Sequence, residues 1–332
     1  MHNNKNISAR VIGTGSYLPL KILTNKEIET QVPGTNADWT YKKLGIDERR
    51  IAAINESTGD LAIKAAEKAL EASELDPKDL DLIILGTTTP RRPAPSTACF
   101  VQHQLGATNS VAFDISAVCS SFIYGMVIAS QFIVSGTYEN ILVIGADTMS
   151  KITDWERRDC VFFGDGAGAA ILSKCPEGEG ILSFDLGSDG SEDFAWTIPA
   201  GGSEQPTSEE TLKDRSHFWQ MDGKAVYNMA IERLPMTLER SLKIANLTIN
   251  DIDHIIPHQP SIGILKKTAE IMNIPFEKFH TNMDKYANTS AATVGITLDE
   301  AVRSKAVKPN DIIAFAAVGA GWTWGSLIVK WS

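Results

Sequence analysis

The sequence predicts a layered α/β fold built from two copies of one structural unit. Residues 79–84 read DLDLII and residues 251–256 read DIDHII, so an acidic turn that enters an apolar strand recurs 172 residues later in a chain of 332 residues. A repeat at about half the chain length indicates a duplicated unit. We therefore expect an N-terminal half at 1–175 and a C-terminal half at 176–332.

The elements around these two segments repeat as well. Each apolar strand follows a stretch with helical spacing of apolar residues, LAIKAAEKALEASELDPK at 61–78 and LPMTLERSLKIANLTIN at 234–250. Later in each half, the apolar strand ENILVIGA at 139–146 corresponds to NDIIAFAAVGA at 310–320. Matching elements in a matching order support a duplication of the whole unit.

Several of the expected strands are apolar without interruption, which is typical of sheets covered by helices on both faces. The glycines of FGDGAGAAIL, residues 163–172, lead into a strand and not into a helix, so they favour close backbone packing over a nucleotide-binding loop. The polar segment PAGGSEQPTSEETLKDRSH at 199–217 is expected to form a long exposed loop. The apolar strands are LIIL at 82–85, VAFDI at 111–115, ILVIGA at 141–146, GAAIL at 168–172 and IIAFAAV at 312–318.

Composition excludes several classes of protein. Lys and Arg number 31 against 41 Asp and Glu, and the resulting net charge of -10 argues against nucleic acid or an anionic membrane as the main partner. The four cysteines form no CxxC pair, so we expect no metal site and free thiols in a reducing cytosol. MHNNKNISAR lacks the apolar run of a signal peptide, and no stretch reaches the roughly 20 apolar residues of a membrane span. We therefore expect a cytoplasmic protein.

Cys119 is the strongest single candidate for chemistry. VAFDISAVCSSFIYG predicts a buried strand, a short turn and a helix whose first turn contains Cys119. A thiol in that place faces free backbone N–H groups and the positive end of the helix dipole, so we expect its pKa to lie below the usual value of about 8.5. The alternative is a small buried apolar residue, the interpretation that we apply to Cys99, Cys160 and Cys175.

Two further polar residues lie where a loop turns into a helix. His258 follows the strand DIDHIIP, at a strand end of the kind where α/β sheets bind ligands. Asn288 lies in KYANTSAAT, before small residues that open a helix. Taken alone, each residue fits a structural role in capping. The half-chain offset, however, maps Cys119 to position 291, so Cys119 and Asn288 would face each other across a pseudo-twofold axis.

Seven sequence motifs, which include Cys119, His258 and Asn288, are distributed over nearly the whole chain. They are GIDERRIA at 45–52, TTTPRRPAPSTAC at 87–99, FDISAVCSSFIYG at 113–125, ITDWERRDCVFFGDGAGAAIL at 152–172, HQP at 258–260, YANTSAAT at 286–293 and GAGWTWGSLIVKW at 319–331. In their order and spacing the chain resembles the β-ketoacyl-acyl-carrier-protein synthase III family of the thiolase-like superfamily. The resemblance implies a five-layered αβαβα fold, a homodimer and no permanently bound cofactor.

The resemblance also implies a triad of Cys119, His258 and Asn288. Cys119 would accept the acyl group of an acyl-coenzyme A substrate, with the backbone N–H groups of Cys119 and Ala320 as oxyanion donors. His258 and Asn288 would stabilise the enolate left when malonyl-acyl carrier protein loses carbon dioxide. Attack of that enolate on acyl-Cys119 would give the β-ketoacyl thioester that initiates fatty acid synthesis. Coenzyme A contacts are implied at Thr35, Trp39 and Arg158.

The chain departs from the family pattern at several positions. Ser121 stands where the family has glycine after Cys-Ser, and Ala320 stands within the usual Gly-Gly-Gly. The arginine that typically contacts the carrier protein is Gly263, and Lys266 and Lys267, one helical turn further on, are the replacement that we expect for its charge.

The primer pocket is a further departure. Ala94 stands before Pro95, where members specific for short acyl chains often have an aromatic residue, and Arg91 and Arg92 lie just upstream. One interpretation of the arginine pair is a solvated loop. The other is a widened pocket with a cation at its end, suited to a longer or carboxylated acyl chain.

Two alternative functions remain, and the departures motivate the first of them. A specialised acyltransferase or condensing enzyme of the same type would serve secondary metabolism or the synthesis of a biotin precursor. A non-enzymatic partner of another synthase is the second, and it is disfavoured because such proteins usually lack the nucleophile that Cys119 supplies.

Overall fold

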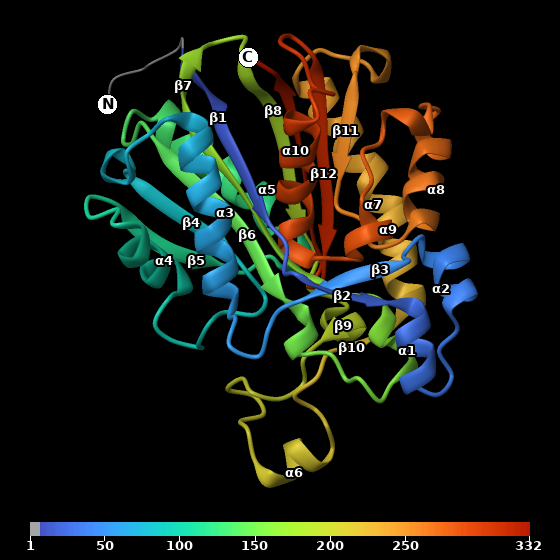
Figure 1. Cartoon of the computed structure of the whole chain (residues 1–332). Coiled ribbons are helices and arrows are strands. Elements are labelled where there is room, and N and C mark those ends of the chain that lie inside the picture. Colours follow the sequence, from blue (N-terminus) through green and yellow to red (C-terminus); the bar gives the residue numbers. More distant parts are fainter. Residues whose placement is uncertain (1–6) are drawn as a thin grey trace.

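Two mixed β-sheets form the framework of the computed structural model, which describes residues 7–332 (Figure 1). In the first sheet the strands follow the order β1 (Ile7–Tyr17), β7 (Asp165–Pro176), β6 (Ile141–Thr148), β4 (Leu82–Gly86) and β5 (Val111–Ile115). In the second sheet the order is β11 (His254–Pro257), β12 (Ile312–Gly319), β13 (Thr323–Lys330) and β8 (Gly180–Ser188).

The two sheets share one connectivity. In the first, β4 pairs with β6 in parallel and β6 pairs with β7 antiparallel; in the second, β11 pairs with β12 in parallel and β12 pairs with β13 antiparallel. The repeated segments of the sequence form equivalent strands, which confirms the predicted duplication. The boundary between 175 and 176 stays a prediction, although the strands of the first sheet all end by Pro176 and those of the second begin at Gly180.

Helices cover both faces of each sheet and produce the five layers expected for the fold. One outer layer contains α3 (Thr58–Ser73) and α4 (Thr97–Leu105), and the other contains α7 (Gly223–Ile244) and α8 (Ile262–Met272). The middle layer, α5 (Ser121–Val134) and α10 (Thr293–Arg303), contacts both sheets and is buried over most of its length (Figure 1). Within residues 7–332, even the longest helices are too short or too polar to cross a membrane.

Glycines allow the middle layer to lie directly on the first sheet. A Cβ atom on Gly145 would come within 2.0 Å of the Ala291 carbonyl oxygen, and one on Gly168 would come within 2.4 Å of the Gly295 backbone. Any larger residue would push the two halves apart at these points. The glycines of the FGDGAGAAIL segment therefore serve backbone packing, as the sequence predicts.

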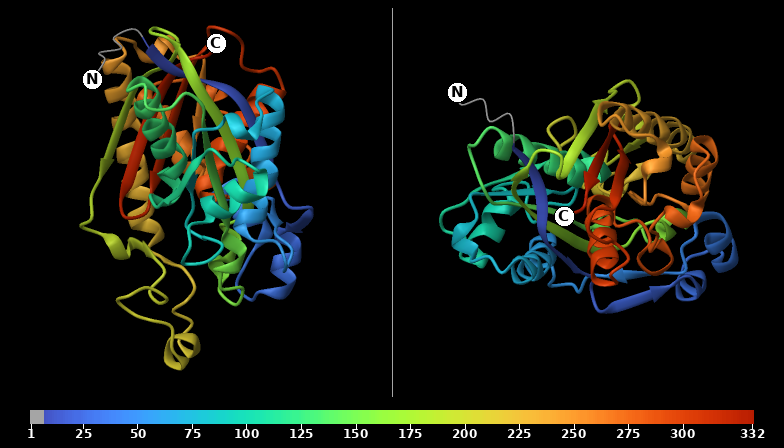
Figure 2. Two further views of the ribbon diagram at one scale, coloured as in Figure 1. Left: turned by 90° about the vertical axis from the view of Figure 1, so that its left-hand side faces the viewer. Right: turned by 90° about the horizontal axis from the view of Figure 1, so that it is seen from above.

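The smaller elements lie around one end of the sheets. They are β2 (Lys21–Thr24), β3 (Glu48–Ile51), α1 (Asn25–Gln31), α2 (Ala37–Leu44), β9 (Trp196–Thr197), β10 (Gln220–Met221), α6 (Glu209–Lys213) and α9 (Met283–Tyr286). The segment 199–217, which carries α6, stands out from the body as an exposed lobe, as expected (Figures 1 and 2). Its base is fixed by Arg215, whose guanidinium pairs with the buried carboxylate of Asp154.

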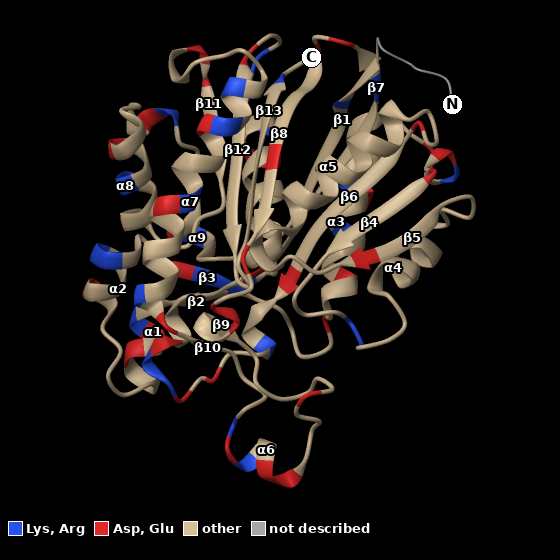
Figure 3. Cartoon of the chain, turned by 180° about the vertical axis from the view of Figure 1, so that it is seen from behind, with Lys and Arg blue, Asp and Glu red and all other residues tan. Residues whose placement is uncertain are grey.

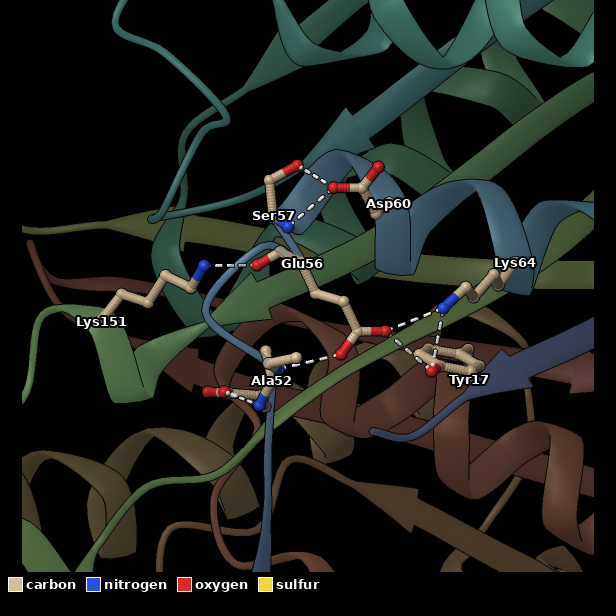
Figure 4. A network of polar contacts seen from close by, with 9 residues as sticks. Tyr17, Ala52, Glu56, Ser57, Asp60, Lys64 and Lys151 are labelled. Atoms are coloured by element: carbon tan, nitrogen blue, oxygen red, sulfur yellow. Dashed lines mark hydrogen bonds and ion pairs between the residues drawn. The ribbon is translucent and has the colours of Figure 1, made fainter. Parts of the chain in front are cut away.

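The loop that links β3 to α3 is held by the carboxylate of Glu56 (Figure 4). Glu56 accepts hydrogen bonds from Lys64 Nζ at 2.8 Å, Tyr17 Oη at 3.0 Å and the Ala53 N–H at 2.9 Å. Burial acts to raise the pKa of Glu56, but these hydrogen bonds outweigh it and lower the pKa below 4.5. The charged form of Glu56 therefore stabilises the folded state.

We predict that Glu56→Gln lowers the free energy of unfolding by about 1 kcal/mol at pH 7, because the amide cannot serve all three donors. The folded pKa is depressed, so this stabilisation is complete above the unfolded pKa of 4.5 and is lost as the pH falls through the folded value. Urea denaturation at pH 7 and pH 3.5 measures the difference. Glu67→Gln, on the exposed face of α3, is the control. A Glu56→Gln effect that is equally large at both pH values would contradict the assignment.

Candidate active site

A cavity of about 340 Å³ lies between the two halves of the chain. Cys119, His258 and Asn288 all border it, so the structure brings together the three residues that the sequence nominates. Most of the remaining wall is apolar, which is typical of a site that binds an apolar group. The apolar wall includes Leu44, Met149, Phe162, Phe163, Trp196, Met221, Val226, Ile264, Val318 and Trp322.

Cys119 lies in a single 3-10 turn, Val118–Ser120, that leads from β5 into α5. Val118 has a φ of +47°, a conformation that β-branched residues rarely adopt and that occurs mainly at functional sites. The Cys119 Sγ atom lies 3.7 Å from Ser290 Oγ. Cys119 of one half thus contacts the helix mouth of the other half.

The expected depression of the Cys119 pKa is wrong for the unliganded site. Burial raises the pKa of the thiol to about 12; a hydrogen bond with Ser290 opposes this shift, and the nearby Asp147 carboxylate adds to it. The first turn is a 3-10 turn of three residues within an enclosed, largely apolar cavity, so the benefit of a helix terminus is outweighed by desolvation. Cys119 is therefore a neutral thiol in the free protein at neutral pH.

His258 follows β11 and is 1% exposed. Its backbone N–H donates to the Ala316 carbonyl at 2.7 Å, which fixes it at the end of the second sheet. Burial lowers the pKa of the imidazole to about 3, so it is neutral. Nδ1 is buried without a hydrogen-bond partner in residues 7–332, which leaves Nε2 as the atom available to a ligand.

Hydrogen bonds of both backbone groups of Asn288 fix its position. Its N–H donates to the Phe162 carbonyl at 3.1 Å, and its carbonyl accepts from Gly164 N–H at 3.0 Å. The side-chain Oδ1 accepts from the Ser290 N–H at 2.8 Å. Because Oδ1 is engaged in this way, Nδ2 is the group of the amide that is left to donate a hydrogen bond to a ligand in the cavity.

The loop after β12 closes the cavity beside Cys119. A Cβ atom on Gly319 would lie 2.7 Å from the Ala117 carbonyl oxygen and 3.0 Å from the Cys119 nitrogen, so glycine is required for this close approach. Gly321 has a φ of +122°, which favours glycine again. Ala320 lies between the two glycines and borders the cavity, so the extra methyl group is accommodated.

The three residues expected at the end of the primer pocket do not border the cavity of their own chain. Arg91, Arg92 and Ala94 are exposed in the loop between β4 and α4, and none of them is among the described residues that border the cavity. The Arg91 guanidinium stacks over the ring of Phe100 at 4.1 Å, which fits the interpretation of a surface loop.

The residues expected to contact coenzyme A and the carrier lie near the mouth of the cavity. Trp39 is 50% exposed on α2, and Lys43 on the same helix borders the cavity. Arg158 packs near Gly34, immediately before Thr35, since a Cβ atom on Gly34 would lie 3.9 Å from the Arg158 Cβ. Lys266 and Lys267 lie on α8, and α2 and α8 lie next to each other on one side of the molecule (Figure 3).

The departure at Ser121 has a structural explanation. Ser121 is fully buried, its Oγ accepts from the Ala117 N–H at 2.9 Å, and it packs against Gly86. It therefore supports the turn that carries Cys119 and does not border the cavity. Gly263 does border the cavity and leaves open space there, since a Cβ atom would meet nothing closer than 3.9 Å.

Sequence analysis missed Ser290, whose hydroxyl contacts Cys119, and Asp147, whose charge acts to raise the pKa of the Cys119 thiol. Ser290 lies two residues after Asn288, and its contact with Cys119 could have been inferred from the half-chain offset. Asp147 ends the apolar strand ILVIGA, a position where a buried carboxylate signals a specific role.

Comparison with known proteins gives one consistent result. The family model described as 3-Oxoacyl-[acyl-carrier-protein (ACP)] synthase III matches residues 113–190, and the model of its C-terminal part matches residues 242–331. Together these segments cover about half of the chain, and they contain Cys119, His258 and Asn288.

Similar proteins extend the likeness over the whole chain. A Beta-ketoacyl-[acyl-carrier-protein] synthase III from Caldanaerobacter subterraneus subsp. tengcongensis is 48% identical over 327 residues, 98% of each chain. One from Natranaerobius thermophilus is 45% identical over 98% of this chain and 99% of the relative. The crystal structure of 3-oxoacyl-[acyl-carrier-protein] synthase III from Aquifex aeolicus VF5 has a TM-score of 0.90 at 40% identity, covering 97% of this chain and 100% of that one.

Proposed function

The chain belongs to the 3-oxoacyl-[acyl-carrier-protein] synthase III family, and we propose that Cys119, His258 and Asn288 carry out that family's reaction. The protein condenses an acyl-coenzyme A primer with malonyl-acyl carrier protein and so initiates fatty acid synthesis. The single observation that carries the assignment of roles is that all three side chains border one cavity between the halves. Because the described cysteines are free thiols, we place the reaction in a reducing cytoplasm.

In the first half-reaction, Cys119 Sγ attacks the thioester carbonyl of the primer and coenzyme A leaves as the thiol. The negative charge that develops on the carbonyl oxygen needs preorganised donors, and we assign this role to the backbone N–H groups of Cys119 and Ala320, two residues that border the cavity. The thiol proton must leave as the carbon–sulfur bond forms, because burial disfavours a thiolate in the free site. Acyl-Cys119 then occupies the apolar part of the cavity.

In the second half-reaction, malonyl thioester loses carbon dioxide and leaves an enolate whose charge is on the thioester oxygen. His258 is neutral and Asn288 presents Nδ2, so both donate hydrogen bonds to that oxygen without adding a buried charge. The enolate carbon attacks acyl-Cys119, the carbon–sulfur bond breaks, and Cys119 recovers a proton. The product is a β-ketoacyl thioester on the carrier.

We predict that Cys119→Ala abolishes both the acyl-enzyme and condensation, because the other cysteines lie outside the cavity. His258→Ala and Asn288→Ala are expected to keep the acylation of Cys119 while carbon dioxide release falls by about 100-fold or more, the scale of losing an oxyanion donor. Intact-mass spectra measure acylation, and labelled malonyl thioester measures decarboxylation. An acyl adduct on Cys119→Ala, or equal losses in both half-reactions for the other two variants, would refute these roles.

The mouth of the cavity is the expected docking place for the two carriers of acyl groups. We assign coenzyme A to the rim that carries Thr35, Trp39 and Arg158, where an exposed indole and a guanidinium suit an adenine ring. We assign the acidic carrier protein to Lys266 and Lys267. Lys267 pairs with Glu270 at 2.8 Å, so Lys266 is the less engaged of the two.

We also propose a C2 homodimer through β5. This strand is at the edge of the first sheet, and Val111 on it is 50% exposed. An apolar edge strand that stays unpaired is an aggregation hazard, which self-pairing removes. The loop of Arg91, Arg92 and Ala94 adjoins this edge through α4, which packs on β5, so a dimer would bring it toward the partner.

Sedimentation equilibrium at micromolar concentration is predicted to give a dimer of the 36.1 kDa chain. Val111→Lys places a charge on the exposed side of the edge strand and is expected to shift the equilibrium toward monomer. A wild-type monomer, or a dimer that Val111→Lys leaves unchanged, would contradict the proposed interface.

A longer or carboxylated primer is the second candidate function, and Ala94 is the observation that favours it. If the loop reaches a partner's cavity, alanine in place of an aromatic residue leaves room at the end of the acyl chain. Each further buried methylene then raises kcat/KM by roughly fourfold, the equivalent of about 0.8 kcal/mol. A terminal carboxylate would gain a charge-assisted contact with Arg91 or Arg92.

The comparison of acetyl-, hexanoyl- and glutaryl-coenzyme A tests this candidate. We predict a preference for hexanoyl over acetyl in the wild type, and a loss of at least tenfold with glutaryl in Arg91→Ala or Arg92→Ala. A clear preference for acetyl would exclude the widened pocket. Glutaryl activity that neither arginine variant lowers would exclude the carboxylate contact alone.

A further inference from the structure

Asp147, the penultimate residue of β6, is a fully buried carboxylate whose charge acts on the Cys119 thiol. Its Oδ1 atom accepts four hydrogen bonds from the turn that follows β4. The donors are Thr87 Oγ1 at 3.0 Å, the Thr88 N–H at 2.8 Å, the Thr89 N–H at 3.0 Å and Thr89 Oγ1 at 2.8 Å. Burial raises the pKa of Asp147, and this set of donors acts in the opposite direction.

The second oxygen of Asp147 reaches into the other half of the chain. Oδ2 accepts from the Ala291 N–H at 3.0 Å, in the 3-10 turn Ser290–Ala292 that opens α10. Ser290 has a φ of +52°, so this turn is a strained conformation that needs an external anchor. The turn carries the Ser290 N–H that orients Asn288 and the Ser290 hydroxyl that contacts Cys119.

Asp147 is also the charged group that faces Cys119. The elements packed around the turn that carries the thiol are α5, β12, β13 and the 290–292 turn, and the one charged residue in these described segments is Lys330, at the far end of β13. Three titratable residues besides Cys119 border the cavity: His258, which burial keeps neutral, Lys43 on α2 and Tyr227 on α7. A negative charge in this place disfavours the thiolate of Cys119.

We propose that Asp147 is a positioning residue that keeps Cys119 and Asn288 in register across the two halves, by anchoring the 87–89 turn on one oxygen and the 290–292 turn on the other. Its negative charge also acts together with burial to raise the pKa of the Cys119 thiol. The inference rests on the proposed function, since it concerns the same cavity. The proposed role of Asp147 differs from a purely structural one, because a structural carboxylate would leave the reactivity of Cys119 unchanged.

Asp147→Asn tests both parts of the proposal. The amide has the same shape, but its NH2 group must face the donors of one turn, so one of the two anchors is lost. We expect kcat for condensation to fall by about tenfold or more with KM for the primer within about twofold, because the fault lies in the geometry of the reacting groups. Loss of the charge is expected to raise the rate of Cys119 alkylation by iodoacetamide at pH 8 severalfold, since the thiolate fraction rises as the pKa of the thiol falls.

Asp165→Asn is the matched control. Asp165 is equally buried, lies opposite Thr148 in the β6–β7 register, and accepts from Ala52 N–H at 2.7 Å and Ser150 N–H at 2.8 Å. This variant is expected to lower thermal stability while Cys119 alkylation at pH 8 stays at the wild-type rate. Alkylation that is equally fast in both variants, or unchanged in Asp147→Asn, would overturn the proposal.

If Asp147→Asn fails to fold, Thr89→Val keeps the charge and removes one donor to Oδ1. Its expected result is a fall in kcat of about threefold or more with alkylation at the wild-type rate. An unchanged kcat would overturn the positioning role. Failure of the proposed function itself would be distinguishable, because the wild type would then show no condensation, whereas failure of this inference leaves wild-type condensation intact.

Discussion

Close backbone contact between the two halves is the constraint on which the site depends. Gly145 allows β6 to lie against Ala291, and Gly319 allows the loop after β12 to lie against Ala117 and Cys119. A side chain at either glycine would occupy space that backbone atoms already fill. With the halves this close, Cys119 from the first half reaches Ser290, and through it Asn288, from the second. The cavity therefore depends on the close packing of both halves of the duplicated fold.

The duplication also explains why the mouths of two helices meet. Val118 and Ser290 both have positive φ angles, and each begins a 3-10 turn that leads into a helix of the middle layer. The equivalent turns have diverged in chemistry, because one presents the Cys119 thiol and the other presents a hydroxyl and an oriented amide. Strain at matched positions in both halves indicates that the geometry of the turns is maintained for the site.

The sequence predicts more of the fold than of the electrostatics. Repeated apolar strands and the half-chain offset are local patterns, so the duplicated sheets and the proximity of Cys119 to position 291 could be inferred from them. The raised pKa of Cys119 could not be inferred from the sequence. It depends on burial and on the charge of Asp147, whose position follows from the register of β6. The sequence also could not show that Arg91, Arg92 and Ala94 lie outside the cavity of their own chain. Their position depends on how the β4–α4 loop packs against Phe100.

The central claim is that Cys119 accepts an acyl group within the cavity between the halves. Peptide mass mapping after incubation of the wild-type protein with a panel of acyl-coenzyme A thioesters, without malonyl thioester, tests it most directly. The account predicts that each true primer adds its own acyl mass to the peptide that contains Cys119, and that subsequent malonyl-acyl carrier protein removes it. An acyl mass on another residue, or no adduct with any primer while condensation proceeds, would contradict the account.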